Sequence, residues 1–201
     1  MKRNISAIIA IAALLVAFGA LAGNVEWQYD AAHSRVGFSV RHLGISKVGG
    51  EFKSVKAKVV ADVDTGRVAS IEATVDVASI NTGVEARDNH LRSPDFFDVA
   101  RFPQLTVKAD RIAWNGNRLS GTAQMTIKGV TRSVPFEGEY LGVQKANFGQ
   151  GAQLRAGYSM TATINRKDFG LGFNAIVEGT AVVSDQVAIT VDVELFRNLA
   201  K

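Results

Sequence analysis

The chain has 201 residues, with 23 lysines and arginines against 19 aspartates and glutamates, and it contains no cysteine. The lack of cysteine excludes disulfides and a thiol-linked lipid anchor, so the fold must rest on a hydrophobic core and hydrogen bonds. The formal net charge of +4 falls to +2 without Lys2 and Arg3, and no basic stripe remains to bind nucleic acid.

The first 22 residues have the features of a secretory signal peptide. Lys2 and Arg3 form a short basic start, residues 5–18 carry no charge, and Ala20-Leu21-Ala22 supplies the small residues that a signal peptidase recognises. We therefore predict an exported protein that is cleaved after Ala22 and has one mature domain, residues 23–201. The alternative is a retained membrane anchor, because an apolar run of this length is borderline for spanning a bilayer.

Most of the mature chain alternates apolar and polar residues with a period of two, the pattern of strands with one dry and one wet face. The apolar residues of each predicted strand share one face, and about eight to ten strands are expected. The clearest sets are Val36, Phe38 and Val40; Ile71, Ala73, Val75 and Val77; Leu119, Gly121, Ala123, Met125 and Ile127; Tyr158, Met160, Ala162 and Ile164; and Val187, Ile189, Val191, Val193 and Leu195.

Turn signals separate these strands. Asn115-Gly116 predicts a two-residue hairpin loop, because both residues tolerate a positive φ. Lys128-Gly129 is expected to close the next hairpin, and Asp64-Thr65-Gly66 and Ser184-Asp185 predict two further turns.

One segment has a helical pattern. Thr82 followed by Glu85 has the spacing of a capping box, and the helical pattern continues to Arg92. A second helical turn is expected to begin at Ser93, with Pro94 in its first helical position.

The strands must cover one another, because each has an apolar face and one short helix cannot shield them all. The sheet is therefore expected to bury its inner faces on itself, as a closed barrel or a two-sheet sandwich. Hairpins in series favour an all-β, antiparallel, up-and-down barrel with one or two short helices. A barrel of about eight or more strands can enclose a ligand, whereas a sandwich fills its gap with side chains.

The predicted inner face mixes small and large residues. The small ones are Gly37, Gly121, Ala123, Ala162, Gly179 and Ala181, and the large ones are Phe38, Met125, Phe136, Tyr140, Tyr158 and Met160. Small inward residues leave room, and methionine and phenylalanine make an adaptable wall for an apolar ligand. The pattern fits equally well a barrel that is filled by alternating small and large side chains.

The sequence offers little for catalysis or metal binding. His33 and His42 lie at opposite ends of one predicted strand, about 30 Å apart when it is extended, and His90 has no histidine near it in sequence. No serine elbow, cysteine nucleophile or serine–lysine motif is present. We expect neither catalytic residues nor a bound metal.

The densest polar cluster is the predicted helix together with the residues that follow it. Arg87 and His90 lie three residues apart on one helix face, and Phe96 and Phe97 come directly after the helix. At one end of a barrel, Arg87 and His90 could hydrogen-bond the head group of a ligand while the phenylalanines cover its tail. Alternatively, the segment is a structural plug.

A set of motifs then runs through nearly the whole mature chain. They are Tyr29-Asp30, His33-Ser34, Val36 with Phe38 and Val40, Arg41-His42-Leu43, Val48 to Phe52, Arg87-Asp88, His90-Leu91, Asp95 to Asp98, Phe102-Pro103, Thr126 to Thr131, Arg166 with Asp168-Phe169-Gly170, and Val187 to Glu194. In order and spacing they resemble the YceI family of bacterial periplasmic proteins.

The resemblance implies a lipocalin-like barrel in the periplasm that binds a polyisoprenoid, an isoprenoid quinone such as ubiquinone, or a fatty amide in an apolar tunnel. It implies no catalytic residue and no cofactor other than such a lipid. The residues expected to bind the ligand are Phe38, Val40, Val75, Arg87, His90, Phe96, Phe97, Ala123, Met125, Phe136, Tyr140, Tyr158, Met160, Ala162 and Phe169.

The partner is expected to be a long-chain apolar small molecule and not nucleic acid. A monomer or a homodimer without a stable membrane anchor is expected, and transient contact with a membrane or a membrane protein is left open. Two other functions also stay open. A lipid-modifying enzyme would place an acid or base inside the tunnel, and an interaction module would have its barrel closed by side chains.

Overall fold

The computed structural model describes residues 23–149, 151–177 and 179–199. The predicted signal peptide, residues 1–22, lies outside this part of the chain. The described residues form antiparallel β-sheet, one α-helix, α1 (Glu85–Arg92), and two 3-10 helices, η1 (Val77–Ser79) and η2 (Arg166–Phe169). No helix in the described part of the chain is both long and apolar enough to cross a lipid bilayer.

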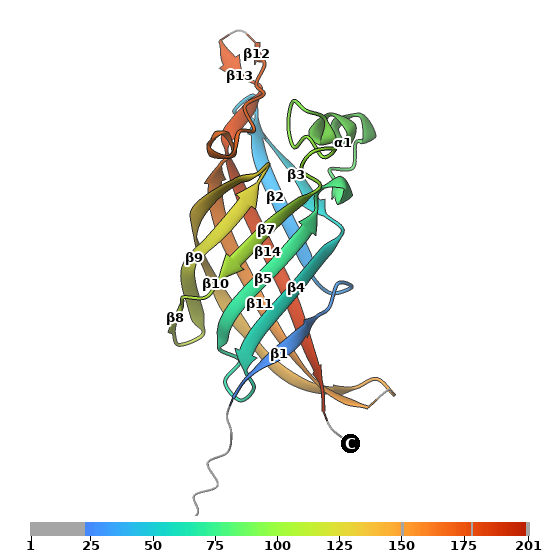
Figure 1. The fold of residues 1–201 in the computed structure, drawn as a ribbon, viewed down its shortest axis with the longest axis vertical. Helices are drawn as coiled ribbons and strands as arrows, with labels where there is room; N and C mark the ends of the chain where they lie inside the picture. Colours follow the sequence, from blue (N-terminus) through green and yellow to red (C-terminus); the bar gives the residue numbers. More distant parts are fainter. Residues whose placement is uncertain (1–22, 150, 178, 200–201) are drawn as a thin grey trace, which may run out of the picture.

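Eight strands close into an antiparallel barrel (Figure 1). In spatial order they are β1 (Asn24–Tyr29), β4 (Val55–Asp62), β5 (Val68–Asp76), β7 (Gln104–Ala109), β9 (Arg118–Ile127), β10 (Val130–Asn147), β11 (Ala152–Asn165) and β14 (Val183–Asn198). The ring is closed where β1 pairs with β14, with Tyr29 opposite Leu195. The predicted lipocalin-like barrel is therefore confirmed.

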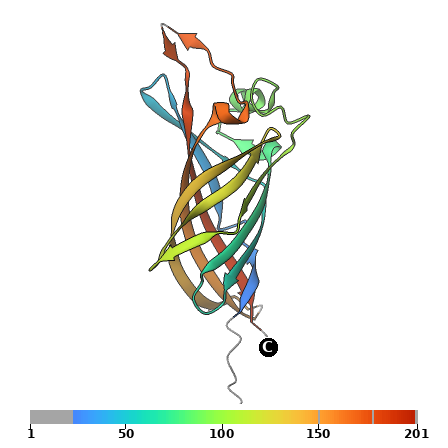
Figure 2. The same cartoon turned by 60° about the vertical axis from the view of Figure 1, so that its left-hand side comes forward.

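Other strands lie outside the closed ring of eight. β2 (Arg35–His42), β3 (Ser46–Phe52) and β6 (Ile80–Asn81) continue the sheet from the edge of β14, and β8 (Ile112–Asn115) pairs with β9. β12 (Ile176–Val177) and β13 (Thr180–Ala181) form a separate small hairpin. Figures 1 and 2 show α1, the β2–β3 hairpin and the β12–β13 hairpin at the end of the barrel that lies away from the C-terminus.

Two of the four predicted turns need correction. Lys128-Gly129 is a two-residue loop as expected, with φ of 50° and 75°, and the Asp64-Thr65-Gly66 turn joins β4 to β5. The turn after β8 lies one residue later than predicted, at Gly116-Asn117, because Asn115 already pairs with Arg118. Ser184-Asp185 is not a turn but part of β14, at an irregularity in its pairing with β2.

The helix has the predicted end but a different start. Val84 is the N-cap, without a side-chain hydrogen bond, so the predicted capping box does not form. The Thr82 hydroxyl instead donates to Asp88 Oδ1 at 2.5 Å, because the chain before α1 folds back on the first turn of the helix. After α1, Ser93-Pro94 begins a hydrogen-bonded turn rather than a second helical segment.

The interior of the barrel divides into two ends. At the end near β1, which we call the closed end, Trp27, Tyr158 and Leu195 pack in a dense core. Burial raises the pKa of Tyr158, and its hydroxyl donates to the Gly66 carbonyl at 2.7 Å. The barrel is thus largely filled at its closed end, and the larger open space within the described residues lies toward α1.

Candidate functional site

A cavity of about 470 Å³ occupies the barrel end near α1. This volume lies in the range of about 300–1,000 Å³ that is typical of small-molecule pockets. Inward residues of β2, β3, β4, β5, β7, β9, β10, β11 and β14 form its wall, and α1 and the loop after η2 complete it. A small separate void of about 70 Å³ lies beyond it toward the closed end, lined in part by Tyr158.

Glycines keep large side chains against the barrel wall. A Cβ atom at Gly50 would lie 2.4 Å from Cζ of Phe38, and one at Gly121 would lie 3.0 Å from the Phe136 ring. Both rings can therefore rest over a neighbouring strand and leave the lumen open. The predicted inward positions Gly179 and Ala181 are wrong, because they belong to the β12–β13 hairpin outside the wall.

Aromatic rings from two separate segments meet at the mouth of the cavity. The His90 ring on α1 lies 5.1 Å from the Phe96 ring and 4.8 Å from the Phe173 ring, and those two phenylalanine rings are 5.0 Å apart. The two pairs that include His90 have edge-to-face geometry, which is one of the arrangements that aromatic rings prefer. This cluster joins the helix region to the loop after η2, so the two segments close the mouth together.

Polar groups at the mouth are held in fixed positions. Arg87 donates through Nε to Thr82 Oγ1 at 2.7 Å and through Nη2 to the Thr82 carbonyl at 2.9 Å. Buried Asp88 accepts from the backbone N–H and the hydroxyl of Thr82. Arg87, His90 and Thr82 all border the cavity, so a ligand would meet hydrogen-bonding groups there and apolar side chains deeper inside.

Arg166 anchors the loop that carries Phe173. Its side chain is only 3% exposed, and it donates to the carbonyls of Leu171 at 2.6 Å and Phe173 at 2.7 Å. It also donates to the Ser184 carbonyl and to Asp185 on β14. A hydrogen bond from Lys167, together with the charges of Lys167 and Arg166, holds the pKa of Asp185 below its ordinary value. This buried cation fixes the loop to the irregular start of β14.

The structure brings most of the predicted ligand-binding residues together. Twelve of them line the cavity: Phe38, Val40, Val75, Arg87, His90, Phe96, Phe97, Ala123, Met125, Phe136, Met160 and Ala162. Whether they bind a ligand stays a prediction.

Three predicted residues, Tyr140, Tyr158 and Phe169, do not line the cavity. Tyr140 packs against Tyr158 toward the closed end, at 5.2 Å between ring centroids. Phe169 is buried in η2, where it contributes to the core around the cavity instead of its surface.

Other residues of the lining were not predicted. Thr82 was assigned to a helix cap, and Phe173 lies in a loop without strand periodicity. Arg166 appeared only as part of a motif, because nothing in the sequence shows that its side chain is buried. Phe52, on β3, could have been found from its alternation with Gly50, since both point into the barrel.

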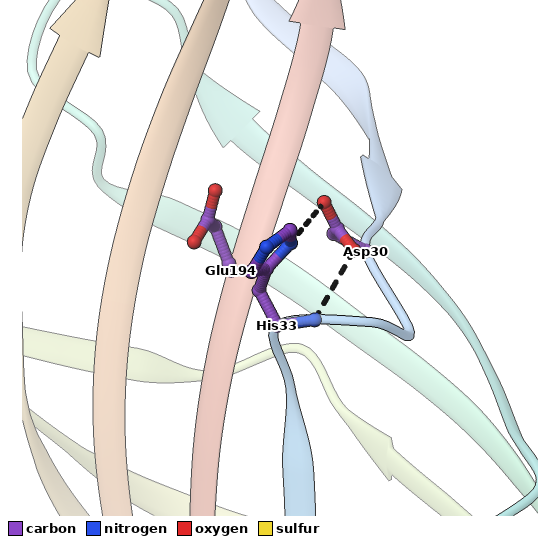
Figure 3. A group of neighbouring side chains, drawn as sticks. All are labelled: Asp30, His33 and Glu194. Atoms are coloured by element: carbon purple, nitrogen blue, oxygen red, sulfur yellow. Dashed lines mark hydrogen bonds and ion pairs between the residues drawn. The ribbon is translucent and has the colours of Figure 1, made fainter.

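A second polar cluster lies on the outer surface toward the closed end (Figure 3). Atoms of Asp30, His33 and Glu194 lie within 4.8 Å of one another, a grouping that could hold a metal ion. Arg155, however, forms ion pairs with both carboxylates. Burial alone would raise the pKa of Asp30, but hydrogen bonds from His33, the Ala32 N–H and Arg155 hold it below its ordinary value. A guanidinium thus supplies the positive charge, and the cluster ties β1, β11 and β14 together.

Comparisons with known proteins agree with this architecture. The YceI-like domain model matches residues 27–195. A UPF0312 protein of Staphylococcus aureus is 38% identical over 158 residues, which cover 79% of this chain and 89% of the relative.

Two solved structures have a similar fold. The YCEI protein of Campylobacter jejuni shares 29% sequence identity with a TM-score of 0.67, and the match covers 80% of this chain and 90% of that one. A polyisoprenoid binding domain from Saccharophagus degradans, implicated in plant cell wall breakdown, shares 14% identity with a TM-score of 0.55, over 86% of this chain and 98% of that one. The family match across most of the chain, together with the closed barrel, shows that this protein belongs to the YceI family.

Proposed function

We propose that the protein binds a long apolar lipid in its barrel and carries it through an aqueous compartment. The observation that carries this proposal is the cavity of about 470 Å³, which is walled by aliphatic and aromatic side chains and has hydrogen-bonding groups at its mouth. Such a cavity favours a molecule with an apolar tail and a small polar head. An empty apolar space of this size would be costly to keep unless a ligand fills it.

Two alternatives are less well supported by the cavity. An interaction module would have a filled barrel, whereas side chains fill only the closed end here. A lipid-modifying enzyme needs an acid or base near the reacting group. Among the described residues that line the cavity there is no aspartate or glutamate, and its histidines, His42 and His90, lie at the mouth end. Binding without chemistry therefore fits best.

The ligand class that we propose is a polyisoprenoid, an isoprenoid quinone or a fatty amide. The fold is shared with the polyisoprenoid binding domain of Saccharophagus degradans, which supports the first of these. The basic, apolar and small-residue pattern of residues 2–22 supports export of the protein, and we propose the periplasm as its compartment. Together these support a role in moving or storing a lipid.

An affinity in the micromolar range is sufficient for such a carrier. At about 0.3 kcal/mol per heavy atom, a ligand with about 28 bound heavy atoms gains about 8 kcal/mol, which corresponds to a Kd of about 1 μM. A ligand held this tightly can still be released without an energy source.

The experiment is a titration of delipidated protein with ubiquinone and with a long-chain prenol, read out by displacement of a fluorescent apolar probe. Arg87→Ala should weaken ubiquinone binding several-fold, because a hydrogen bond to a neutral head group contributes about 1 kcal/mol net. A pyrophosphate head group should lose more, and in a salt-dependent manner.

Arg118→Ala is the control, since Arg118 is exposed at the start of β9, at the end of the barrel that lies away from the cavity mouth. A thermal melt checks that loss of the Arg87–Thr82 contacts has not destabilised the segment that precedes α1. If neither lipid binds the wild-type protein, the carrier function is wrong; wild-type affinity in a normally melting Arg87→Ala variant would remove only the head-group role.

A further inference from the structure

Exposed aliphatic side chains project from the two hairpin tips at the mouth end. Ile45, in the β2–β3 turn, is 82% exposed, and Ile176 and Val177, on β12, are 72% and 51% exposed. We call these three residues the rim tips. Figures 1 and 2 both show the two hairpins extending beyond the barrel on the side of α1. Large apolar side chains that are this exposed on protruding hairpins are candidates for an interaction site.

The two tips form one structural unit that is continuous with the cavity wall. Leu43 donates its backbone N–H to the Val182 carbonyl at 3.0 Å, and His42 pairs with Val183. Val182 in turn donates to the Ala175 carbonyl at 2.9 Å, at the base of β12. His42, Val182 and Val183 also line the cavity. A surface that receives the rim tips would therefore lie directly against the cavity mouth.

Basic side chains lie just below one of the tips. Arg41 and Lys47 occupy directly opposite positions on β2 and β3, and both are exposed. Like charges in such cross-strand positions destabilise a hairpin by themselves. An anionic surface would relieve this repulsion. On a docked bilayer, Arg41 and Lys47 would lie at the depth of the lipid head groups, and Ile45 would reach the acyl chains.

We propose that the rim tips dock the mouth of the barrel onto an anionic lipid bilayer, so that the apolar ligand passes between membrane and cavity without crossing water. The cargo part of this inference rests on the proposed function, whereas the docking itself does not. A bilayer suits the rim tips better than a protein partner does. It accepts separate protruding side chains at any spacing, whereas a protein interface needs a continuous complementary face.

The test is co-sedimentation with vesicles of phosphatidylcholine alone or mixed with phosphatidylglycerol. Wild-type protein should bind the mixed vesicles, and the double variant Ile45→Glu/Ile176→Glu should partition at least ten-fold less. Arg41→Glu/Lys47→Glu should lose the preference for phosphatidylglycerol.

The matched control is Leu141→Glu/Phe148→Glu. These residues are 64% and 71% exposed on the β10–β11 hairpin, at the opposite end of the barrel. This variant should partition like wild type. Equal partitioning of the rim-tip variant and wild type, or an equal loss in the control variant, would overturn the proposal.

A second measurement separates docking from cargo binding. Prenol added from ethanol in vesicle-free buffer should bind the rim-tip variant with wild-type affinity, while its uptake from vesicles should slow at least ten-fold. If no variant binds prenol, the proposed function fails, and the vesicle assay still decides the docking. If sedimentation analysis shows that the rim-tip variant converts a dimer into a monomer, the tips bind a second copy of the chain and the membrane proposal is wrong.

Discussion

Replacing Ala162 with phenylalanine should abolish binding of the apolar ligand while the barrel stays folded. Ala162 lies on β11 opposite Phe136 and Ile189 and faces the cavity. A benzyl group at this position would occupy the lumen of a 470 Å³ cavity where a tail has to pass. We expect at least a 100-fold loss of affinity for prenol, at a cost to folding of about 1–3 kcal/mol for overpacking.

Thr163→Phe is the matched control, because the next residue on the strand points to the exposed face and the added side chain is the same. Affinity is measured by probe displacement and folding by urea titration. Ala123→Trp, on β9, provides a second block if Ala162→Phe folds poorly. Wild-type affinity in a normally folded blocking variant would mean that the ligand binds elsewhere.

Replacing Arg166 with methionine should lower the free energy of unfolding more than any other substitution proposed for this protein. The substitution keeps much of the side-chain volume but removes the donors to the carbonyls of Leu171, Phe173 and Ser184. Each buried polar group left without a partner costs about 1–3 kcal/mol, so the free energy of unfolding should fall by about 3–5 kcal/mol. Ligand release should also become faster, since Phe173 loses its anchor at the mouth.

Lys167→Met is the control for this prediction. Lys167 is the adjacent residue and also pairs with Asp185, at 2.8 Å, but its side chain is 49% exposed. An exposed ion pair contributes only about 0–1 kcal/mol, so this variant should unfold close to wild type. If urea titration places Arg166→Met within about 1 kcal/mol of wild type, Arg166 is not the anchor of the loop.

The fold could be predicted from the sequence where it depends on a local pattern of residues. Alternation in Leu119 to Ile127 and in Val187 to Leu195 predicts which side chains face inward, because successive residues of a strand point to opposite faces. Closure of the ring by β1 and β14, and the attachment of β2 and β3 to the edge of β14, depend on pairing between distant segments. No local pattern records such pairing.

The site could be predicted only in part for a related reason. Alternation shows the face on which Tyr158 lies but not its height in the barrel, and at that height Trp27 and Leu195 fill the interior. Phe173 escaped prediction because its position is set by hydrogen bonds from Arg166, not by strand periodicity. Arg87 and His90 were predicted at the mouth because polar residues stand out on the single helix of an all-strand pattern.

The most direct test of lipid carriage is mass spectrometry of organic extracts from the protein purified from its own cells, without added lipid. A lipid carrier should yield a molecule with an isoprenoid or long acyl tail at close to one per barrel in the wild type, and this molecule should be absent from Ala162→Phe prepared in the same way. Extracts without any such molecule, from protein that also fails to take up ubiquinone or prenol afterwards, would contradict lipid carriage.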